Sequence, residues 1–159
     1  MIHPAFIHLG IALAWMFLGG NTTLGGFASG LVFGFIAMAL FRNALHCRHY
    51  IRRVLAGVRF FFHFIYLILL SNLKIARAAI LREAPRIKGE FLVYRIDGLT
   101  DFETLLLCQC IGLTPGTIVT DRIPNDSALI LHAFASGTAE EIRRFVDQEL
   151  KYPILLFTR

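Results

Sequence analysis

Four side chains near the end of the sequence are of types that can carry out catalysis: Cys108, Cys110, Asp121 and His132. A thiol with a histidine and a carboxylate is a set used in nucleophilic catalysis. However, Cys108 and Cys110 lie in an apolar run that predicts a helix, where thiols usually serve as inert packing. Asp121 and His132 fall on neighbouring predicted strands and could pair, but no third group orients them and no glycine-rich phosphate loop accompanies them. The sequence therefore predicts no catalytic residue and no enzyme.

Residues 46–49, His-Cys-Arg-His, contain three potential metal ligands. Two arginines, Arg42 and Arg48, crowd this segment, and no carboxylate lies nearby to complete a ligand set. We therefore predict no metal site and no cofactor.

The residues Thr114, Pro115, Gly116 and Thr117 lie between the apolar run 102–111 and a β-branched run that reaches Asp121. Pro-Gly at the centre of such a segment is typical of a type II turn, because proline fixes φ and glycine tolerates positive φ. The two threonines can close the turn through side-chain hydrogen bonds to the backbone. One interpretation is a plain connection from a helix to a strand.

The composition separates the chain into two parts. Hydrophobic residues make up 56% of its 159 residues, above the range of about 45–50% usual in soluble proteins. The first acidic residue is Glu83, and eight arginines and lysines precede it. Acids slightly outnumber bases afterwards. This pattern predicts a membrane part followed by a water-facing part, not a nucleic-acid-binding protein. The odd number of cysteines favours a reduced, cytoplasmic setting.

The membrane part is expected to cover residues 1–82, with apolar helices at about 2–18, 24–41 and 54–79 and a basic linker at 42–53. The first two helices are short for a bilayer and predict a tight hairpin. Gly26, Gly30 and Gly34 recur at a spacing that lets another helix approach closely. No signal-peptide cleavage site is evident.

The third apolar segment contains His63, which is either functional or a neutral histidine hydrogen-bonded to a neighbouring helix. Both flanks of this segment are basic, although three full crossings would place them on opposite sides. Either the first two helices do not fully cross the membrane, or the third lies partly in the interface.

Residues 83–159 predict a small α+β domain in the order β-α-β-β-α. The expected strands are 90–96, 118–122 directly after the Thr-Pro-Gly-Thr turn, and 128–132, with a connection at 124–127. A helix covers 102–111, with Asp101 as its expected N-cap. Thr138 and Glu141 predict a capping box that begins the last, amphipathic helix.

Several of these motifs together resemble the E-type subunit of the multisubunit sodium/proton antiporter of the Mrp or Mnh type. Residues 113–117, Leu-Thr-Pro-Gly-Thr, are followed by a strand and by a second strand that ends in His132, as in that family. Ser71 and Asn72 match a Ser-Asn motif in its third helix. The sequence departs from the family in one respect, because residues 64–70 lack the Glu that often precedes this motif.

The resemblance implies an accessory subunit in the cell membrane, multi-pass, with a cytoplasmic C-terminal domain. Its partners would be the lipid bilayer and the other membrane subunits, which would carry Na+ and H+. The residues agree, because ion transport through a membrane normally needs buried carboxylates and the three apolar segments contain no Asp or Glu. The alternative function is a membrane-tethered binding or sensor module with no transport partner. The expected docking residues are Thr114, Pro115, Gly116, Thr117, Asp121 and His132.

Overall fold

The computed structural model describes residues 3–80, 89–123, 127–134 and 138–159 of the chain. The chain divides into two compact units, residues 1–55 and 56–159. The second unit therefore includes most of the third apolar segment, whereas the sequence placed the start of the α+β domain at residue 83. The expected boundary between membrane and water at 82/83 lies outside the described residues and stays a prediction.

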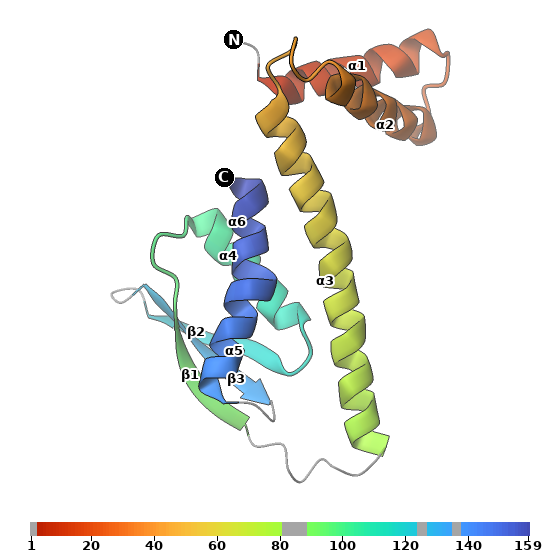
Figure 1. Ribbon diagram of the computed structural model, residues 1–159. Coiled ribbons are helices and arrows are strands. Elements are labelled where there is room, and N and C mark those ends of the chain that lie inside the picture. The colour runs from red at the N-terminus through yellow and green to blue at the C-terminus, as the bar shows by residue number, and fades with distance from the viewer. Residues whose placement is uncertain (1–2, 81–88, 124–126, 135–137) are drawn as a thin grey trace. The chain divides into compact units, whose positions relative to one another are not determined.

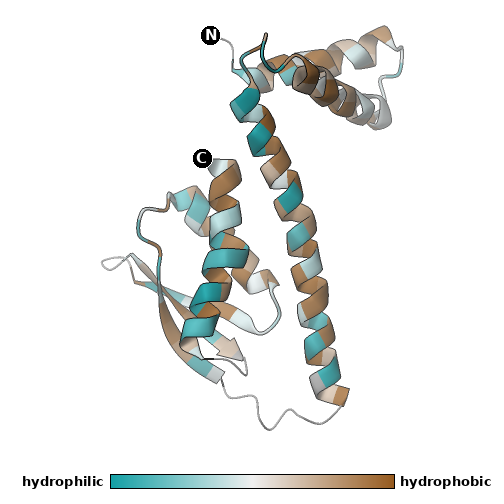
Figure 2. Cartoon of the chain, viewed as in Figure 1, coloured by the Kyte–Doolittle hydropathy of each residue, from teal (hydrophilic) through white to brown (hydrophobic). Residues whose placement is uncertain are grey.

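Two apolar helices, α1 (Pro4–Leu18) and α2 (Leu24–Leu40), open the first unit and lie side by side (Figure 1). Pro4 occupies the first turn of α1, where its missing N–H costs nothing. Thr23 caps α2 by accepting a hydrogen bond from the Gly26 N–H at 3.2 Å. Both helices are hydrophobic along most of their length (Figure 2). This agrees with the expected hairpin of two short helices.

A buried histidine links the helices of the first unit. His8 Nε2 lies 2.8 Å from the Leu31 carbonyl oxygen, and Nδ1 lies 2.7 Å from the Tyr50 hydroxyl. Because a carbonyl oxygen only accepts, Nε2 donates to Leu31, and Nδ1 forms a hydrogen bond with the Tyr50 hydroxyl. A small apolar cluster of Met38, Cys47 and Ile51 packs beside these contacts.

The long helix α3 (Arg48–Ile80) begins inside the expected basic linker, so residues 48–53 form its first turns. By length and composition, the part Arg48–Arg77 is apolar enough to cross a membrane. The helices α1 and α2 are shorter than such a span.

A three-stranded antiparallel sheet forms the centre of the second unit. Its strands are β1 (Gly89–Arg95), β2 (Thr117–Ile123) and β3 (Ala128–Phe134), in the order β1-β3-β2. The pairing of β2 with β3 confirms the expected hairpin. Residues 124–126 of the expected connection lie outside the described residues.

Helices cover one face of this sheet. The buried side chains Leu92 and Tyr94 of β1 and Leu129 and Leu131 of β3 form a core with α4 (Asp101–Leu113) and with the C-terminal helix. Phe60 and Leu67 of α3 are buried in the same core. The order β-α-β-β-α expected from the sequence is confirmed. In addition, α3 packs against the core of this domain.

The N-cap of α4 is Thr100, so the expectation that Asp101 caps this helix is wrong. Thr100 and Glu103 form a capping box, in which the Thr100 hydroxyl accepts from the Glu103 N–H and the Glu103 carboxylate accepts from the Thr100 N–H. This reciprocal pair satisfies two helix-terminal donors, whereas Asp101 would satisfy one. Asp101 instead begins the helix and lies 3.5 Å from Arg122 of β2.

The C-terminal helix is continuous from α5 (Ala139–Phe145) through a π-helical segment, η3 (Val146–Lys151), to α6 (Tyr152–Thr158). Thr138 and Glu141 form the expected capping box at its start. Pro153 explains the π segment, because proline lacks the N–H of a regular helix and its ring clashes with the carbonyl four residues earlier. Widening the preceding turn removes that clash.

Candidate functional site

The Thr-Pro-Gly-Thr segment is a type II turn that ends α4 and starts β2. The Thr117 N–H donates to the Thr114 carbonyl at 3.3 Å, and Gly116 has φ of 97°. The Thr114 hydroxyl donates to the Cys110 carbonyl at 2.8 Å, and the Thr117 hydroxyl donates to the Ile111 carbonyl at 3.1 Å. Both hydroxyls thus add a hydrogen bond to carbonyl groups of the last turn of α4, to which the Thr114 N–H also donates.

Thr114 is only 3% exposed. Its hydroxyl is used inside the domain, so this side chain fixes the direction in which β2 leaves α4. Pro115, Gly116 and Thr117 are half-buried. This geometry fits the plain helix-to-strand connection, and gives the turn a positioning role for β2.

Asp121 follows an irregularity in β2. The register of β2 on β3 shifts between Val119 and Asp121, and the Thr120 hydroxyl between them donates to the Ile130 carbonyl at 3.0 Å. Asp121 is exposed, and its carboxylate accepts a hydrogen bond from the Arg122 N–H at 2.7 Å. A bulge of this kind bends a strand and redirects the side chains that follow it.

His132 lies near the middle of the sheet, on β3. Its ring stacks on Phe91 of β1 with centroids 4.3 Å apart, and its partner on β2 is Ile118. Asp121 is opposite Ile130, two residues away along β3. Asp121 and His132 are therefore on adjacent strands, as expected, but the register does not place them opposite one another.

The face of the sheet opposite the core is apolar, and sequence reasoning missed it. Phe91 and Val93 of β1 and Ile118 of β2 are 65%, 46% and 50% exposed, and Ile130 and His132 lie between them, half-buried. We call these five residues the outer sheet face. The signal was present in the sequence, since β1 and β3 carry apolar side chains at successive positions instead of alternating with polar ones.

Ser71 and Asn72 both lie on α3. Ser71 is half-buried, and the exposed Asn72 amide donates to the Ile68 carbonyl of its own helix at 2.9 Å. His63 of α3 reaches the C-terminal helix of the second unit, because its Nε2 donates to the Glu149 carboxylate of η3 at 2.6 Å. This matches the interpretation of a histidine hydrogen-bonded to a neighbouring helix.

The three glycines of α2 face the inside of the first unit and are buried. A Cβ atom on Gly30 would lie 2.6 Å from the Ala12 carbonyl oxygen, and one on Gly34 would lie 3.1 Å from the His8 ring. A Cβ atom on Gly26 would overlap the backbone of Asn21. The helix that approaches Gly30 and Gly34 is therefore α1 of the same chain.

Burial makes the helical thiols poor nucleophiles. It raises the pKa of the Cys110 thiol to about 11 and also raises the pKa of Cys108. Cys47 is buried and donates to the Met38 carbonyl at 3.5 Å. Within the described ranges, no three His, Cys, Asp or Glu side chains are grouped so that they could hold a metal ion. The arrangement thus offers surfaces for interaction, with no cluster suited to metal-dependent chemistry in the part described.

Comparison with known proteins identifies the family. The sequence model of the family described as Na+/H+ ion antiporter subunit (MNHE) matches residues 8–156. The chain belongs to this family. It is 26% identical over 141 residues to the E subunit of the Na(+)/H(+) antiporter of Bacillus subtilis (strain 168), covering 89% of each chain. It is 29% identical over 133 residues to the E1 subunit of the Na(+)/H(+) antiporter of Staphylococcus aureus (strain bovine RF122 / ET3-1), covering 82% of each. The resemblance to the E-type subunit of the Mrp antiporter is thereby confirmed.

A solved structure shares the fold of this family member. It is a chain from the membrane-bound sulfane sulfur reductase, an archaeal respiratory membrane complex. The two chains are 21% identical, with a TM-score of 0.50, and the match covers 94% of this chain and 97% of the other. At this identity the likeness concerns the fold.

Proposed function

We propose that the chain is an accessory, non-catalytic subunit of a multisubunit monovalent cation (Na+)/proton antiporter in the cell membrane, where it supports assembly and antiport. Membership of the antiporter-subunit family supports this function. The observation that carries the accessory role is the lack of any Asp or Glu between residues 1 and 82. Ion exchange needs groups that change charge within the membrane. The partner subunits therefore carry Na+ and H+.

The hairpin of α1 and α2 anchors the chain in the bilayer in this proposal. These helices contain 15 and 17 residues, or about 23 and 26 Å at 1.5 Å per residue. The hydrocarbon core is about 30 Å thick, so both helices cross it with slight local thinning or stop just short of the far side. Arg42 and Arg48 follow α2, and the positive-inside rule supports a cytoplasmic position for residues 42–48. We propose the same side for the C-terminal domain.

The outer sheet face supplies the surface that docks on cytoplasmic parts of the other subunits. Its three most exposed members are large and apolar, Phe91, Val93 and Ile118. Exposed patches of this kind commonly mark protein interaction sites. His132 lies within the face, and Asp121 lies at its border. The turn at Thr114–Thr117 contributes indirectly, because it sets the position of β2 and therefore of Ile118.

A pull-down from the native membrane tests the accessory role. The tagged full-length chain is extracted in a gentle detergent, and the copurified proteins are identified by mass spectrometry. We expect several large, many-helix membrane subunits in fixed proportion. Recovery of the chain alone would contradict the proposal and would favour a membrane-tethered sensor without a transport partner.

Replacing Pro115 and Gly116 by alanine tests the positioning role of the turn. Gly116 has φ of 97°, a region that alanine enters only with strain of about 1 kcal/mol or more. We expect reduced recovery of the partner subunits and reduced antiport in membrane vesicles. Full assembly and full antiport of the double variant would contradict this role.

A further inference from the structure

We infer that α3 lies along an anionic membrane surface instead of crossing the bilayer. The helix is long and apolar enough to span. In the second unit, however, the two sides of α3 have different surroundings. One side is part of the α+β domain, and the other is an exposed apolar strip bordered by cations.

The first side of α3 packs into the domain. Phe60 and Leu67 are buried in the domain core, and the Phe60 ring lies 5.5 Å from the Phe157 ring of α6. His63, between them, donates to Glu149 at 2.6 Å. These residues follow the spacing i, i+3, i+7, so they form one face of a helix. The contacts cover the middle of the candidate span, where a crossing helix would sit deepest in the bilayer.

Such packing is incompatible with a crossing at this position. If Phe60 to Leu67 lay in the hydrocarbon, the attached domain would bring Glu149 and the open edges of its sheet into the bilayer. Ionised groups and unpaired strand edges are very costly there. A helix at the water–lipid boundary avoids this cost, because the domain then stays in water above it.

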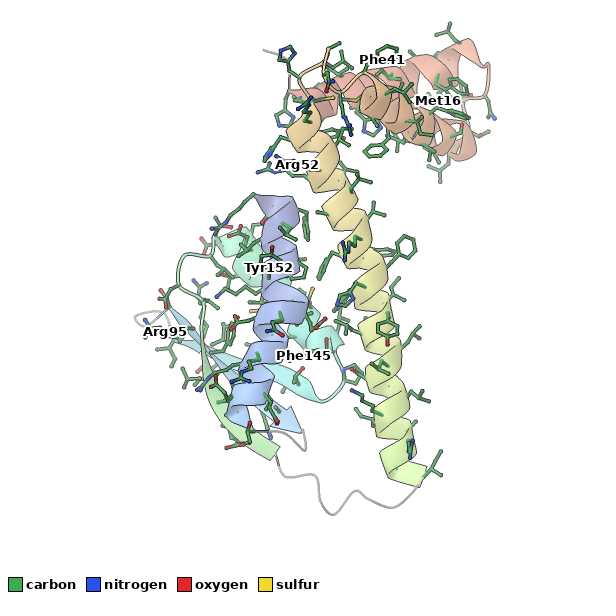
Figure 3. The ribbon with its side chains drawn as sticks, viewed as in Figure 1. Met16, Phe41, Arg52, Arg95, Phe145 and Tyr152 are labelled. Atoms are coloured by element: carbon green, nitrogen blue, oxygen red, sulfur yellow. The ribbon has the colours of Figure 1, made fainter. Side chains whose placement is uncertain are left out.

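The opposite side of α3 is an exposed apolar strip. Its members Val58, Phe62, Ile65 and Leu69 are each exposed, and Leu73 continues the row. At 100° per residue, these positions lie on the side of the helix opposite Phe60 and Leu67. Figure 3 shows side chains on the side of α3 that faces away from the domain, where no described helix or strand of the second unit covers them.

Cations lie along one border of the strip. At 100° per residue, Arg59 and Arg77 fall on the same flank, between the domain face and the apolar strip, and both are exposed. No acidic residue occurs anywhere in α3. An apolar face bordered by basic side chains is typical of helices that lie in the interface of anionic membranes, with the apolar side about 5–10 Å deep. The positive charge of this flank therefore favours anionic lipid as the partner that covers the apolar strip.

Spin labels placed along the strip distinguish the two orientations. Val58, Phe62, Ile65 and Leu69 are replaced one at a time by cysteine in the full-length chain, with the native cysteines changed to serine. The chain and its copurifying subunits are reconstituted in vesicles of phosphatidylcholine and phosphatidylglycerol at 3:1. The depth of each label is measured from its collision rates with oxygen and with a water-soluble nickel complex.

A surface helix places all four labels at similar, shallow depths. A crossing helix separates the labels at Val58 and Leu69 by about 16 Å along the membrane normal and gives a maximum between them. We expect depths that agree within about 5 Å. A spread near 16 Å would overturn the inference. Labels shielded from both reagents would show a covering protein and would also overturn it.

The charge of the border is tested with matched variants. R59Q/R77Q should make the label at Phe62 at least twofold more accessible to the nickel complex, as should vesicles of phosphatidylcholine alone. R122Q/R144Q removes the same charge from exposed positions elsewhere in the second unit and should leave the accessibility unchanged. Equal effects of the two double variants, or no effect of R59Q/R77Q, would overturn the role of anionic lipid.

Discussion

His63 of α3 donates a hydrogen bond to Glu149 of η3 over 2.6 Å, joining residues 86 positions apart in the sequence. The bond lies beside the buried contact of Phe60 with Phe157. A polar contact within an apolar seam thus helps to hold this apolar helix and the α+β domain together. This contact favours one register of the two helices, because sliding either helix would break the hydrogen bond.

We predict that Glu149→Ala loosens α3 from the C-terminal helix. Both side chains are partly exposed, so the interaction is worth about 0.5–1 kcal/mol. A double-mutant cycle with His63→Ala, read by thermal unfolding of the full-length chain in detergent, measures this coupling. Glu140→Ala with Arg144→Ala, an exposed pair at 4.0 Å in α5, serves as the control. Zero coupling between positions 63 and 149 would contradict the register role.

A second prediction concerns Glu103, which is 2% exposed and accepts hydrogen bonds from Arg159, Thr158 and Thr100. The Arg159 guanidinium, followed by the Thr100 backbone N–H, holds the pKa of this carboxyl well below its usual range. The unfolded chain binds a proton at the ordinary glutamate pKa of about 4.3. The ionised carboxylate therefore stabilises the fold above that pH, and the contribution is lost as pH falls below it.

Glu103→Gln should accordingly lower the melting temperature at pH 7 and change it less at pH 3, where the unfolded chain binds a proton at this carboxyl and the ionised native carboxylate contributes less stability. Replacement by alanine, which also breaks the capping box, should cost about 2 kcal/mol at pH 7. Glu90→Gln, at an exposed position of β1, is the matched control. An equal loss of stability for Glu103→Gln at both pH values would argue against the ionised carboxylate as the source.

The outer sheet face gives a third prediction. Phe91→Ser with Ile118→Ser should reduce recovery of partner subunits at least fivefold, because docking loses the two large apolar side chains on either side of His132. Phe102→Ser with Leu105→Ser removes side chains of similar exposure from α4 and should leave recovery unchanged. The two double variants are compared by quantitative mass spectrometry at equal expression. A larger loss with the α4 pair would place the docking surface there instead.

A fourth prediction separates the glycines of the first unit by their surroundings. Gly30→Ala should destabilise the hairpin of α1 and α2, since the added methyl would meet the Ala12 carbonyl oxygen. Gly10→Ala, where nothing lies within 4 Å, should instead stabilise α1 by about 1 kcal/mol. Thermal unfolding of the full-length chain in detergent compares the two. Stabilisation by both substitutions would show that α1 does not approach Gly30 this closely.

The sequence predicted the elements whose local signals agree with their final packing. The Thr138–Glu141 capping box, the turn at Pro115 and Gly116, and the hairpin of β2 with β3 each depend on neighbouring residues. The role of α3 could not be predicted in this way. Its composition is that of a membrane helix, and only the fold brings Phe60 and His63 to residues 86 or more positions away.

In the candidate site, too, features that depend on neighbouring residues were predicted, and features that depend on the whole fold were missed. The hydroxyls of Thr114 and Thr117 were expected to close the turn, and they do. The outer sheet face was missed because exposure of Phe91 and Ile118 depends on which side of the sheet the helices cover. The N-cap of α4 was misplaced by one residue, because Asp101 is itself a good capping residue and Thr100 competes with it.

The π segment Val146–Lys151 also has a consequence for the C-terminal helix as a whole. The buried residues Ile142, Val146, Leu150 and Ile154 recur at every fourth position. In a regular helix, four residues turn about 40° past one full revolution, so this series would wind steadily away from the core. The wider turn, which needs more residues per revolution, corrects the phase midway. Pro153, through the π segment before it, thus keeps apolar residues spaced four apart on one side of the helix, facing the core. Deleting one residue from this segment would rotate Ile154 away from the core.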